Sequence, residues 1–295
     1  MQNWLAALLL VTATAAAAPP ESPAASGASA AGTEAGSAAA ATETGASLAV
    51  RPGSIVRWPG AGIVECRQAE VRSAPIAGAC YFPVDLLATG KIQLERRMAT
   101  GVERRTLAVA AYPYPTESLT GVEEKYVSPP AAELKRIERE QKETAAVFAR
   151  RSSLQFTLPL AAPLAVLPEG GRFGSRRIFN GEARSPHGGT DFKAAPGTVV
   201  YAAADGVVAL AAGQYFAGNA VYIDHGDGLV TMSFHLSAIL VKNGDRVKRG
   251  QAIGKVGATG RVTGPHLHFG ARWRGAKIDP QLLLADPDTW PTITP

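Results

Sequence analysis

The sequence predicts a mainly β protein in which two β-rich regions are joined by one helix. Short apolar runs recur along the chain and are bounded by glycine, proline or aspartate, which is typical of strands and tight turns. One segment after residue 128 instead repeats its apolar side chains at helical spacing. A chain of 295 residues is long enough for two modest domains, each with its own core.

The first 50 residues are not expected to belong to either domain. Residues 1–18 are typical of a secretory signal peptide, because an apolar run too short for a comfortable membrane span is followed by small residues. An uncleaved N-terminal membrane anchor is the alternative. Residues 19–50 are almost entirely Ala, Ser, Gly, Thr, Pro and Glu. They lack the bulky apolar groups that would offset the entropy cost of ordering, so we expect a disordered tether.

Residues 51–127 are predicted to form a small β-rich domain. Its strand-like runs, separated by Gly and Pro, are Ser54–Trp58, Gly62–Val64, Lys91–Arg96 and Arg105–Ala111. Cys66 and Cys80 are the only cysteines of the chain, and in an exported protein such a pair is expected to form a disulfide. A bridge that closes a loop of this size stabilises a domain by about 3 kcal/mol in the chain-entropy model.

A linking helix is predicted over residues 128–151. Ser128 is placed to cap its first turn, where proline is also tolerated. The side chains that recur on one stripe are Leu134, Ile137, Gln141, Ala145 and Phe148. The charged residues fall on the opposite side of this helix, and we expect them to form a solvated face rather than a binding site.

Residues 152–295 are predicted to form an antiparallel β-sheet domain. Its short runs, each bounded by Gly or Asp, are Thr198–Ala202, Gly206–Ala211, Ala220–Ile223 and Leu229–Ser233. Gly226, Asp227 and Gly228 lie between the last two runs and predict a hairpin turn. His225 at this turn is therefore expected to be structural rather than catalytic.

Two of the remaining histidines share one face of a strand. In the segment Gly264–Phe269, His266 and His268 are two residues apart, so their imidazoles project to the same side. Leu267 and Phe269 project to the other side and can enter a core. Strand geometry alone leaves open which of the two histidines would bind a metal.

His187 and Asp191 supply a further imidazole and a carboxylate. Gly188 and Gly189 between them disfavour a helix, so the pair differs from the helical HExxH zinc signature and suits a loop that enters a strand. Two imidazoles and one carboxylate are a ligand set that zinc accepts, with a fourth position left for water. Because water on such an ion can ionise near neutral pH, the sequence predicts a metallohydrolase.

These segments resemble those of the M23 zinc metallopeptidases, the lysostaphin and LytM-type peptidoglycan endopeptidases. The motifs that carry the resemblance, in family order, are His187-x-x-x-Asp191, His235-Leu-Ser and His266-x-His268. Thr259-Gly260-Arg261 precedes the last motif, and the similarity covers roughly residues 170–285. The chain departs from the family pattern at Ser233, where many relatives carry a tyrosine.

The resemblance implies a β-rich M23-type catalytic domain that holds one Zn²⁺ per chain. It implies that His187, Asp191 and His268 bind the zinc and that His235 and His266 are catalytic without binding it. One of these two imidazoles would take a proton from the attacking water, and the other would help to stabilise the oxyanion. Asn180 precedes the first motif and would either line the substrate cleft or belong to an ordinary Asn-Gly turn.

The overall charge is compatible with a function at a cell envelope. The chain carries a formal charge of +5 and has an isoelectric point near 9.3, which favours contact with an anionic surface. Its basic residues are dispersed and are not interleaved with stacking aromatics, so nucleic-acid binding is not indicated. Together with the resemblance, these features predict an exported zinc endopeptidase of the periplasm or cell envelope that hydrolyses peptide crosslinks of peptidoglycan.

Two alternatives remain open at this point. Some LytM-like domains have lost their metal ligands and regulate other wall hydrolases, so the chain would be a non-catalytic regulator that binds and activates an envelope protein. Alternatively, residues 51–150 would inhibit the enzyme by covering its groove, or would direct it to the wall. The sequence also leaves open which crosslink bond is cut.

Overall fold

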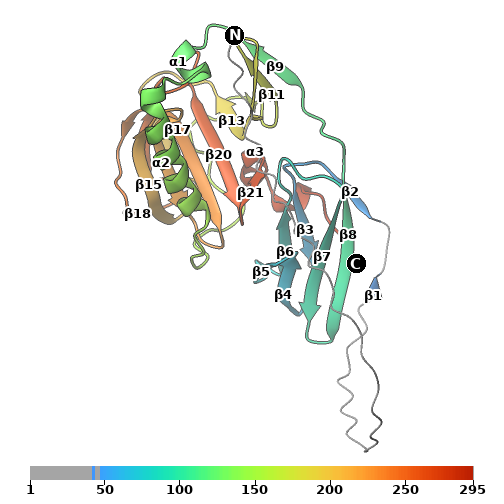
Figure 1. Ribbon diagram of the computed structural model, residues 1–295. Coiled ribbons are helices and arrows are strands. Elements are labelled where there is room, and N and C mark those ends of the chain that lie inside the picture. Colours follow the sequence, from blue (N-terminus) through green and yellow to red (C-terminus); the bar gives the residue numbers. More distant parts are fainter. Residues whose placement is uncertain (1–41, 44–46, 295) are drawn as a thin grey trace, which may run out of the picture. The chain divides into compact units, whose positions relative to one another are not determined.

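The computed structural model describes residues 42–43 and 47–294 and is mainly β, which confirms the predicted fold class (Figure 1). The predicted signal peptide or anchor and most of the predicted tether lie outside the described residues. Within the described ranges, no helix is long and apolar enough to span a membrane.

The N-terminal β region consists of two sheets. Its strands are β1 (Thr42–Glu43), β2 (Leu48–Val50), β3 (Ile55–Pro59), β4 (Ile63–Gln68), β5 (Val71–Ser73), β6 (Ala79–Pro83), β7 (Lys91–Met98) and β8 (Gly101–Val109). One sheet has the order β1-β8-β7-β4-β5, with β2 also on β8, and β3 pairs with β6 in the other. Because β2 begins at Leu48, the last residues of the predicted tether belong to this sheet.

The core of this region lies between the two sheets. Trp58 of β3 and Phe82 of β6 are almost completely buried, and their ring centroids are 6.3 Å apart. Cys66 of β4 forms a disulfide with Cys80 of β6, so the bond joins one sheet to the other. Strand β6 was not predicted, because all five of its residues are buried and no polar alternation marks it.

The segment that follows lies against the C-terminal region. It contains β9 (Thr116–Leu119), α1 (Glu124–Val127) and α2 (Ala131–Phe148). Strand β9 pairs in parallel with β11 (Arg176–Phe179), which forms a hairpin with β12 (Glu182–Arg184). Helix α2 packs against the C-terminal sheet, as Figure 1 shows.

The start of α2 differs from the prediction. Pro130 is its N-cap residue and no side chain caps the helix, whereas Ser128 ends the short helix α1. The prediction that Ser128 caps the helix is therefore wrong. The physical reason is the pair of prolines that follows Ser128. A cap at Ser128 would need Pro129 in helical conformation, which is disfavoured for a residue that itself precedes a proline.

The buried face of α2 is also more polar than the predicted stripe. Ile137, Glu140 and Val147 are the buried residues, whereas Leu134 is 53% exposed. Glu140 accepts a hydrogen bond from the backbone N–H of Tyr215 at 2.8 Å. A buried carboxylate thus fixes the helix on the sheet, and pattern analysis that places all charges on the solvent side misses it.

The C-terminal region is built on one large sheet in which every paired strand is antiparallel, as predicted. Its strands are β10 (Gly170–Gly171), β13 (Gly189–Phe192), β14 (Val199–Tyr201), β15 (Gly206–Gln214), β16 (Gly218–Asp224), β17 (Leu229–Ile239), β18 (Arg246–Val247), β19 (Ala252–Val256), β20 (Leu267–Trp273) and β21 (Ala276–Ile278). The main path is β10-β13-β20-β17-β16-β15-β18, with β19 and β14 attached through β17 and β21 through β20. Helix α3 (Pro280–Leu284) and a 3₁₀ turn (Pro287–Thr289) follow.

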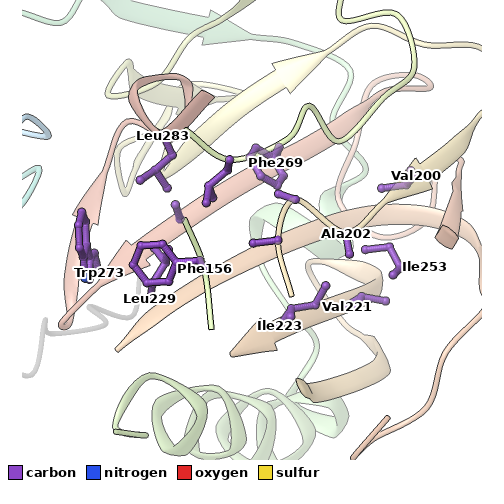
Figure 2. Close-up of a cluster of buried hydrophobic side chains, with 14 of the residues drawn as sticks. Phe156, Val200, Ala202, Val221, Ile223, Leu229, Ile253, Phe269, Trp273 and Leu283 are labelled. Carbon is purple, nitrogen blue, oxygen red and sulfur yellow. The ribbon is translucent and has the colours of Figure 1, made fainter. Parts of the chain in front are cut away.

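Both faces of this sheet carry buried side chains. On β16, Val221 and Ile223 belong to the main core, while Ala220 and Tyr222 pack on the side of α2. Figure 2 shows Val221 and Ile223 in the main core together with Phe269 and Trp273 of β20. Since both faces are buried, the central strands are nearly continuous apolar runs rather than alternating ones.

The β16–β17 hairpin confirms the structural reading of His225. This imidazole is fully buried, and its Nδ1 donates to the Asp205 carbonyl at 2.8 Å. Its Nε2 accepts from the Thr231 hydroxyl at 2.7 Å. Burial lowers the pKa of His225 to about 4, so the ring is neutral at neutral pH with both nitrogens satisfied by the protein.

Candidate metal centre

The register of two neighbouring strands brings the candidate ligands together. Asp191 of β13 lies directly opposite His268 of β20. His187 lies in the loop that enters β13, four residues before Asp191. Phe192 and Leu267, the adjacent residues on these strands, point the other way and are almost completely buried. The alternation predicted for β20 therefore holds, and it also applies to β13.

Three potential ligand atoms converge at this place. The Nε2 atom of His187 lies 2.9 Å from Nδ1 of His268 and 3.1 Å from Oδ1 of Asp191. Nδ1 of His268 lies 2.9 Å from the same Oδ1. Within the described part of the chain, these three residues are the group of His, Cys, Asp and Glu side chains that could hold a metal ion.

The protonation of these atoms suits a cation. Nδ1 of His187 lies 2.9 Å from the carbonyl oxygen of Arg172, which can only accept, so Nδ1 carries the proton and Nε2 a lone pair. Burial lowers the pKa of His187 to about 4, which keeps the ring neutral. Of the three converging atoms, Nδ1 of His268 is then the one that can carry a proton. A divalent cation matches this donor set better than a shared proton does.

The carboxylate of Asp191 is held on both oxygens. Burial acts to raise its pKa, but the imidazoles of His187 and His268 outweigh that effect and hold the pKa well below its usual range. Its second oxygen, Oδ2, accepts a hydrogen bond from Nη2 of Arg177 at 2.9 Å. The guanidinium of Arg177 thus orients the carboxylate so that Oδ1 faces the two imidazoles.

His235 and His266 lie beside this group, and neither Nε2 atom has a hydrogen-bond partner among the described residues. Nδ1 of His235 donates to the Thr259 carbonyl and Nδ1 of His266 to the Gly264 carbonyl, each at 2.9 Å. Their ring centroids are 4.9 Å apart, and Nε2 of His266 is 3.6 Å from Oδ1 of Asp191. Burial lowers the pKa of both rings, so both are neutral proton acceptors at neutral pH.

The backbone at His235 is unusual. Its φ is +64°, a left-handed value that non-glycine residues seldom adopt. The backbone N–H of His235 donates to Ala217 at 2.9 Å instead of continuing the ladder. Such conformations are found mostly where the surrounding structure must aim a functional side chain.

Two neighbours of His268 restrict its ring. Phe234 stacks on it with centroids 5.1 Å apart and planes 7° from parallel. On another side, a Cβ atom at Gly189 would lie 2.6 Å from Nε2 of His268. No local pattern in the sequence predicts the stacking partner, because the contact depends on the register of β17 against β20. Glycine at position 189 is the sequence signal of this close approach, because a residue without a side chain lets its neighbours come near the backbone.

Asn180 is placed away from these groups. It lies in the turn between β11 and β12 with a φ of +49°, and its side-chain amide donates to the Val122 carbonyl at 2.8 Å. It is not among the residues that line the two cavities described next. The Asn-Gly turn of the sequence analysis agrees with this position.

Two cavities open onto the candidate centre. The first has a volume of about 570 Å³, and Asp191, His235 and His266 are among its lining residues. The second has a volume of about 290 Å³ and is lined in part by His187, His235 and His268. No residue from 51–118 lines either cavity, whereas residues from the segment 119–148 line both.

Comparisons with known proteins agree with this architecture. The model of peptidase family M23 matches residues 185–280. Peptidoglycan DD-endopeptidase ShyA of Vibrio cholerae is 49% identical over 108 residues, which are 36% of this chain and 25% of the relative. The DD-carboxypeptidase/endopeptidase Mpg of Neisseria meningitidis is 47% identical over 94 residues, 32% of this chain and 22% of the relative. The chain thus spans about a quarter of the length of these curated relatives.

A solved structure extends the similarity beyond the histidine motifs. A crystal structure assigned to peptidase M23 from Pseudomonas aeruginosa is 32% identical to this chain, with a TM-score of 0.61. The match covers 79% of this chain and 94% of that structure, so it reaches well outside residues 185–280. The chain belongs to peptidase family M23.

Proposed function

We propose that this chain is a zinc-dependent endopeptidase that hydrolyses peptide crosslinks of bacterial peptidoglycan. The observation that carries the proposal is the convergence of His187, Asp191 and His268 beside two further neutral imidazoles, at the place where two cavities open. Relatives named as peptidoglycan DD-endopeptidases support the substrate class. This substrate would place the chain in the cell envelope, with which its net positive charge agrees.

The residues that would hold the zinc ion are His187 through Nε2, Asp191 through Oδ1 and His268 through Nδ1. When bound there, Zn²⁺ supplies a Lewis acid that lowers the pKa of a coordinated water and polarises a carbonyl group. The chain itself prepares the ligands, because Arg172 fixes the tautomer of His187 and Arg177 fixes the orientation of Asp191.

His235 and His266 would handle the protons of the reaction. Each ring has its Nδ1–H tied to a backbone carbonyl, so each presents Nε2 as a base. One imidazole accepts a proton from the attacking water and can later return it to the leaving amine. The other imidazole would lie beside the scissile carbonyl of the substrate, where its Nε2 can donate a hydrogen bond to the oxyanion after it has taken up a proton from solvent.

The intact ligand set favours an enzyme over a non-catalytic regulator. A regulator would not need three ligand atoms within hydrogen-bond distance of one another or two further histidines with free Nε2 atoms. Self-inhibition by residues 51–118 receives no support from the lining of the cavities. Among residues 51–150, the part that lies at the cavity walls is the segment 119–148.

The direct test is digestion of purified peptidoglycan. The purified protein should contain about one zinc per chain and release muropeptides, and a chelator should stop the release until zinc is restored. Product identification by mass spectrometry would show which bond is cut. Muropeptide release that persists at the wild-type rate in His187→Ala or Asp191→Ala protein would overturn the proposal.

A further inference from the structure

Three guanidinium groups gather beside the candidate metal centre. Arg177 of β11 lies directly opposite Arg184 of β12 in the hairpin. Like charges at opposed positions of a ladder destabilise it. Arg261, from the loop before β20, is the third member, and burial together with the charges of Arg177 and Arg184 lowers its pKa to about 10. We call these residues the arginine cluster.

The arginine cluster has more cationic than anionic groups. Arg177 bonds to Asp191, and Arg184 bonds to Glu182. Arg261 has no carboxylate within ion-pair distance among residues 42–43 and 47–294. Its guanidinium instead lies near the rings of Phe179 and Phe216, at 4.9 and 4.8 Å from their centroids.

Buried donors in the same cluster lack acceptors. The Nε atoms of Arg177 and Arg184 are both buried without a hydrogen-bond partner in the described chain. A buried donor without a partner costs stability, and so does a partly buried charge without a counter-charge. An anion beside Arg261 would offset the cost of its uncompensated charge.

The arginine cluster opens directly onto the candidate active site. Among the residues that the structure describes, three line both cavities, and they are Arg177, His235 and Arg261. The loop that carries Arg261 is fixed, because the backbone N–H of Arg261 donates to the Phe216 carbonyl at 2.9 Å. The same loop holds His235 through the Thr259 carbonyl. An anion at Arg261 would therefore lie next to one of the two proposed proton acceptors.

We propose that Arg261, together with the unused N–H groups of Arg177, binds a free carboxylate of the peptide substrate close to the scissile bond. This inference rests on the proposed function, since it requires a peptide in the same cavity. A planar guanidinium pairs with a carboxylate through two parallel hydrogen bonds, and the aromatic rings hold it in place. The site selects crosslinks whose residue beside the cleaved bond keeps its carboxylate free.

The test uses synthetic crosslinked stem peptides and the full, zinc-loaded protein. In one pair, the residue that supplies the scissile nitrogen carries either a free α-carboxylate or a carboxamide. In a second pair, the same change is made on the neighbouring residue, which identifies the source of the carboxylate. Wild-type protein should cleave the acid form of one pair with a kcat/KM about tenfold to a hundredfold higher than the amide form.

Variants then assign this preference to Arg261. Arg261→Gln should lower the acid-to-amide ratio to about one, mainly through KM, and Arg261→Lys should give an intermediate ratio because it keeps charge but not the planar fork. Arg246→Gln removes an exposed arginine of β18 that lines neither cavity, and it should keep the wild-type ratio. An Arg261→Gln protein that retains the wild-type ratio would contradict the assignment.

Failure of this inference can be told apart from failure of the proposed function. Equal cleavage of acid and amide forms in both pairs would overturn the carboxylate site and leave the zinc endopeptidase standing. If no peptide and no peptidoglycan is cleaved, calorimetry of the cleavage products decides the inference. Acid products that bind zinc-loaded wild-type protein no more tightly than their amides would then overturn it.

Discussion

Two buried histidines of this chain, His225 and His187, have nearly the same burial but different surroundings. Their exposed fractions are 0% and 3%, and burial lowers the pKa of each to about 4. In each ring, Nδ1 donates to a backbone carbonyl. At His225 the second nitrogen accepts from the Thr231 hydroxyl, whereas at His187 it faces Oδ1 of Asp191, which is itself an acceptor, and Nδ1 of His268.

The difference lies in what completes the hydrogen bonding of the second nitrogen. In the hairpin, the protein supplies every partner, so the imidazole is a structural polar residue of the core. At the candidate centre, Nε2 of His187 and Oδ1 of Asp191 bring two lone pairs to within 3.1 Å of each other, and a cation between them would satisfy both. Burial and a shifted pKa are therefore shared by both kinds of site, and the identity of the facing atoms separates them.

The largest effect is expected from removing a ligand. His187→Ala should lower zinc content well below one per chain and reduce peptidoglycan cleavage by about 10³-fold or more, because the Lewis acid contributes several kcal/mol. Zinc analysis and muropeptide release measure both changes. His225→Gln is the matched control and should retain zinc and activity. Equal losses in the two variants would remove the distinction between these histidines.

The next effect concerns the imidazoles that do not belong to the ligand group. His235→Ala and His266→Ala should each keep about one zinc per chain and lose activity by about 10²-fold or more, as expected for a proton-transfer group. Calorimetric titration of zinc and initial rates on peptidoglycan separate the two properties. Loss of zinc from the His266→Ala protein would instead place this residue among the ligands.

The pH dependence of stability tests the structural histidine. Because the folded-state pKa of His225 is about 4 and its ordinary value is 6.5, the unfolded chain takes up the proton first as pH falls. The contribution to stability is complete above pH about 6.5 and is lost between about 6.5 and 4, at most about 3 kcal/mol.

Urea unfolding of chelator-treated protein at pH 7.5 and at pH 4.5 measures this contribution. Wild-type protein should lose more stability between these pH values than His225→Gln, in which this group no longer titrates. The other buried histidines are present in both proteins and cancel in the comparison. The same loss in both proteins would show that His225 does not titrate abnormally.

A smaller effect is expected from a methyl group placed against a ligand. Gly189→Ala would put Cβ 2.6 Å from Nε2 of His268 and 2.6 Å from the Phe269 carbonyl oxygen. The displaced ring should weaken zinc binding by about tenfold to a hundredfold. Gly188→Ala is the control, since its Cβ would meet only a lysine side chain at 3.8 Å. Equal zinc affinity of the two variants would show that this contact does not position His268.

Local patterns predicted much of the fold because they depend on neighbouring residues. The alternation around His268 correctly placed its strand, and the Gly-Asp-Gly turn correctly placed the hairpin of His225. Strand β6 escaped prediction because it is buried on both faces, and the start of α2 was misplaced because Ser128 precedes two prolines. These errors arise where tertiary burial or a special backbone residue overrides the local signal.

The surroundings of the site were harder to predict than its main residues. Arg177 and Asp191 belong to strands of two different sheets, β11 and β13, and Phe234 stacks on His268 only in the observed register of β17 and β20. Neither contact leaves a periodic trace in the sequence. Resemblance to a family supplied the metal-binding residues as a prediction, but not the groups that fix their tautomers and orientations.

The most direct test of the central claim is an anomalous difference map at the zinc absorption edge from a zinc-loaded crystal. We predict one strong peak about 2.0 to 2.2 Å from Nε2 of His187, Oδ1 of Asp191 and Nδ1 of His268. His235 and His266 should lie outside the coordination shell. A peak bound by His266 in place of His268, or no peak among these three residues, would contradict the account.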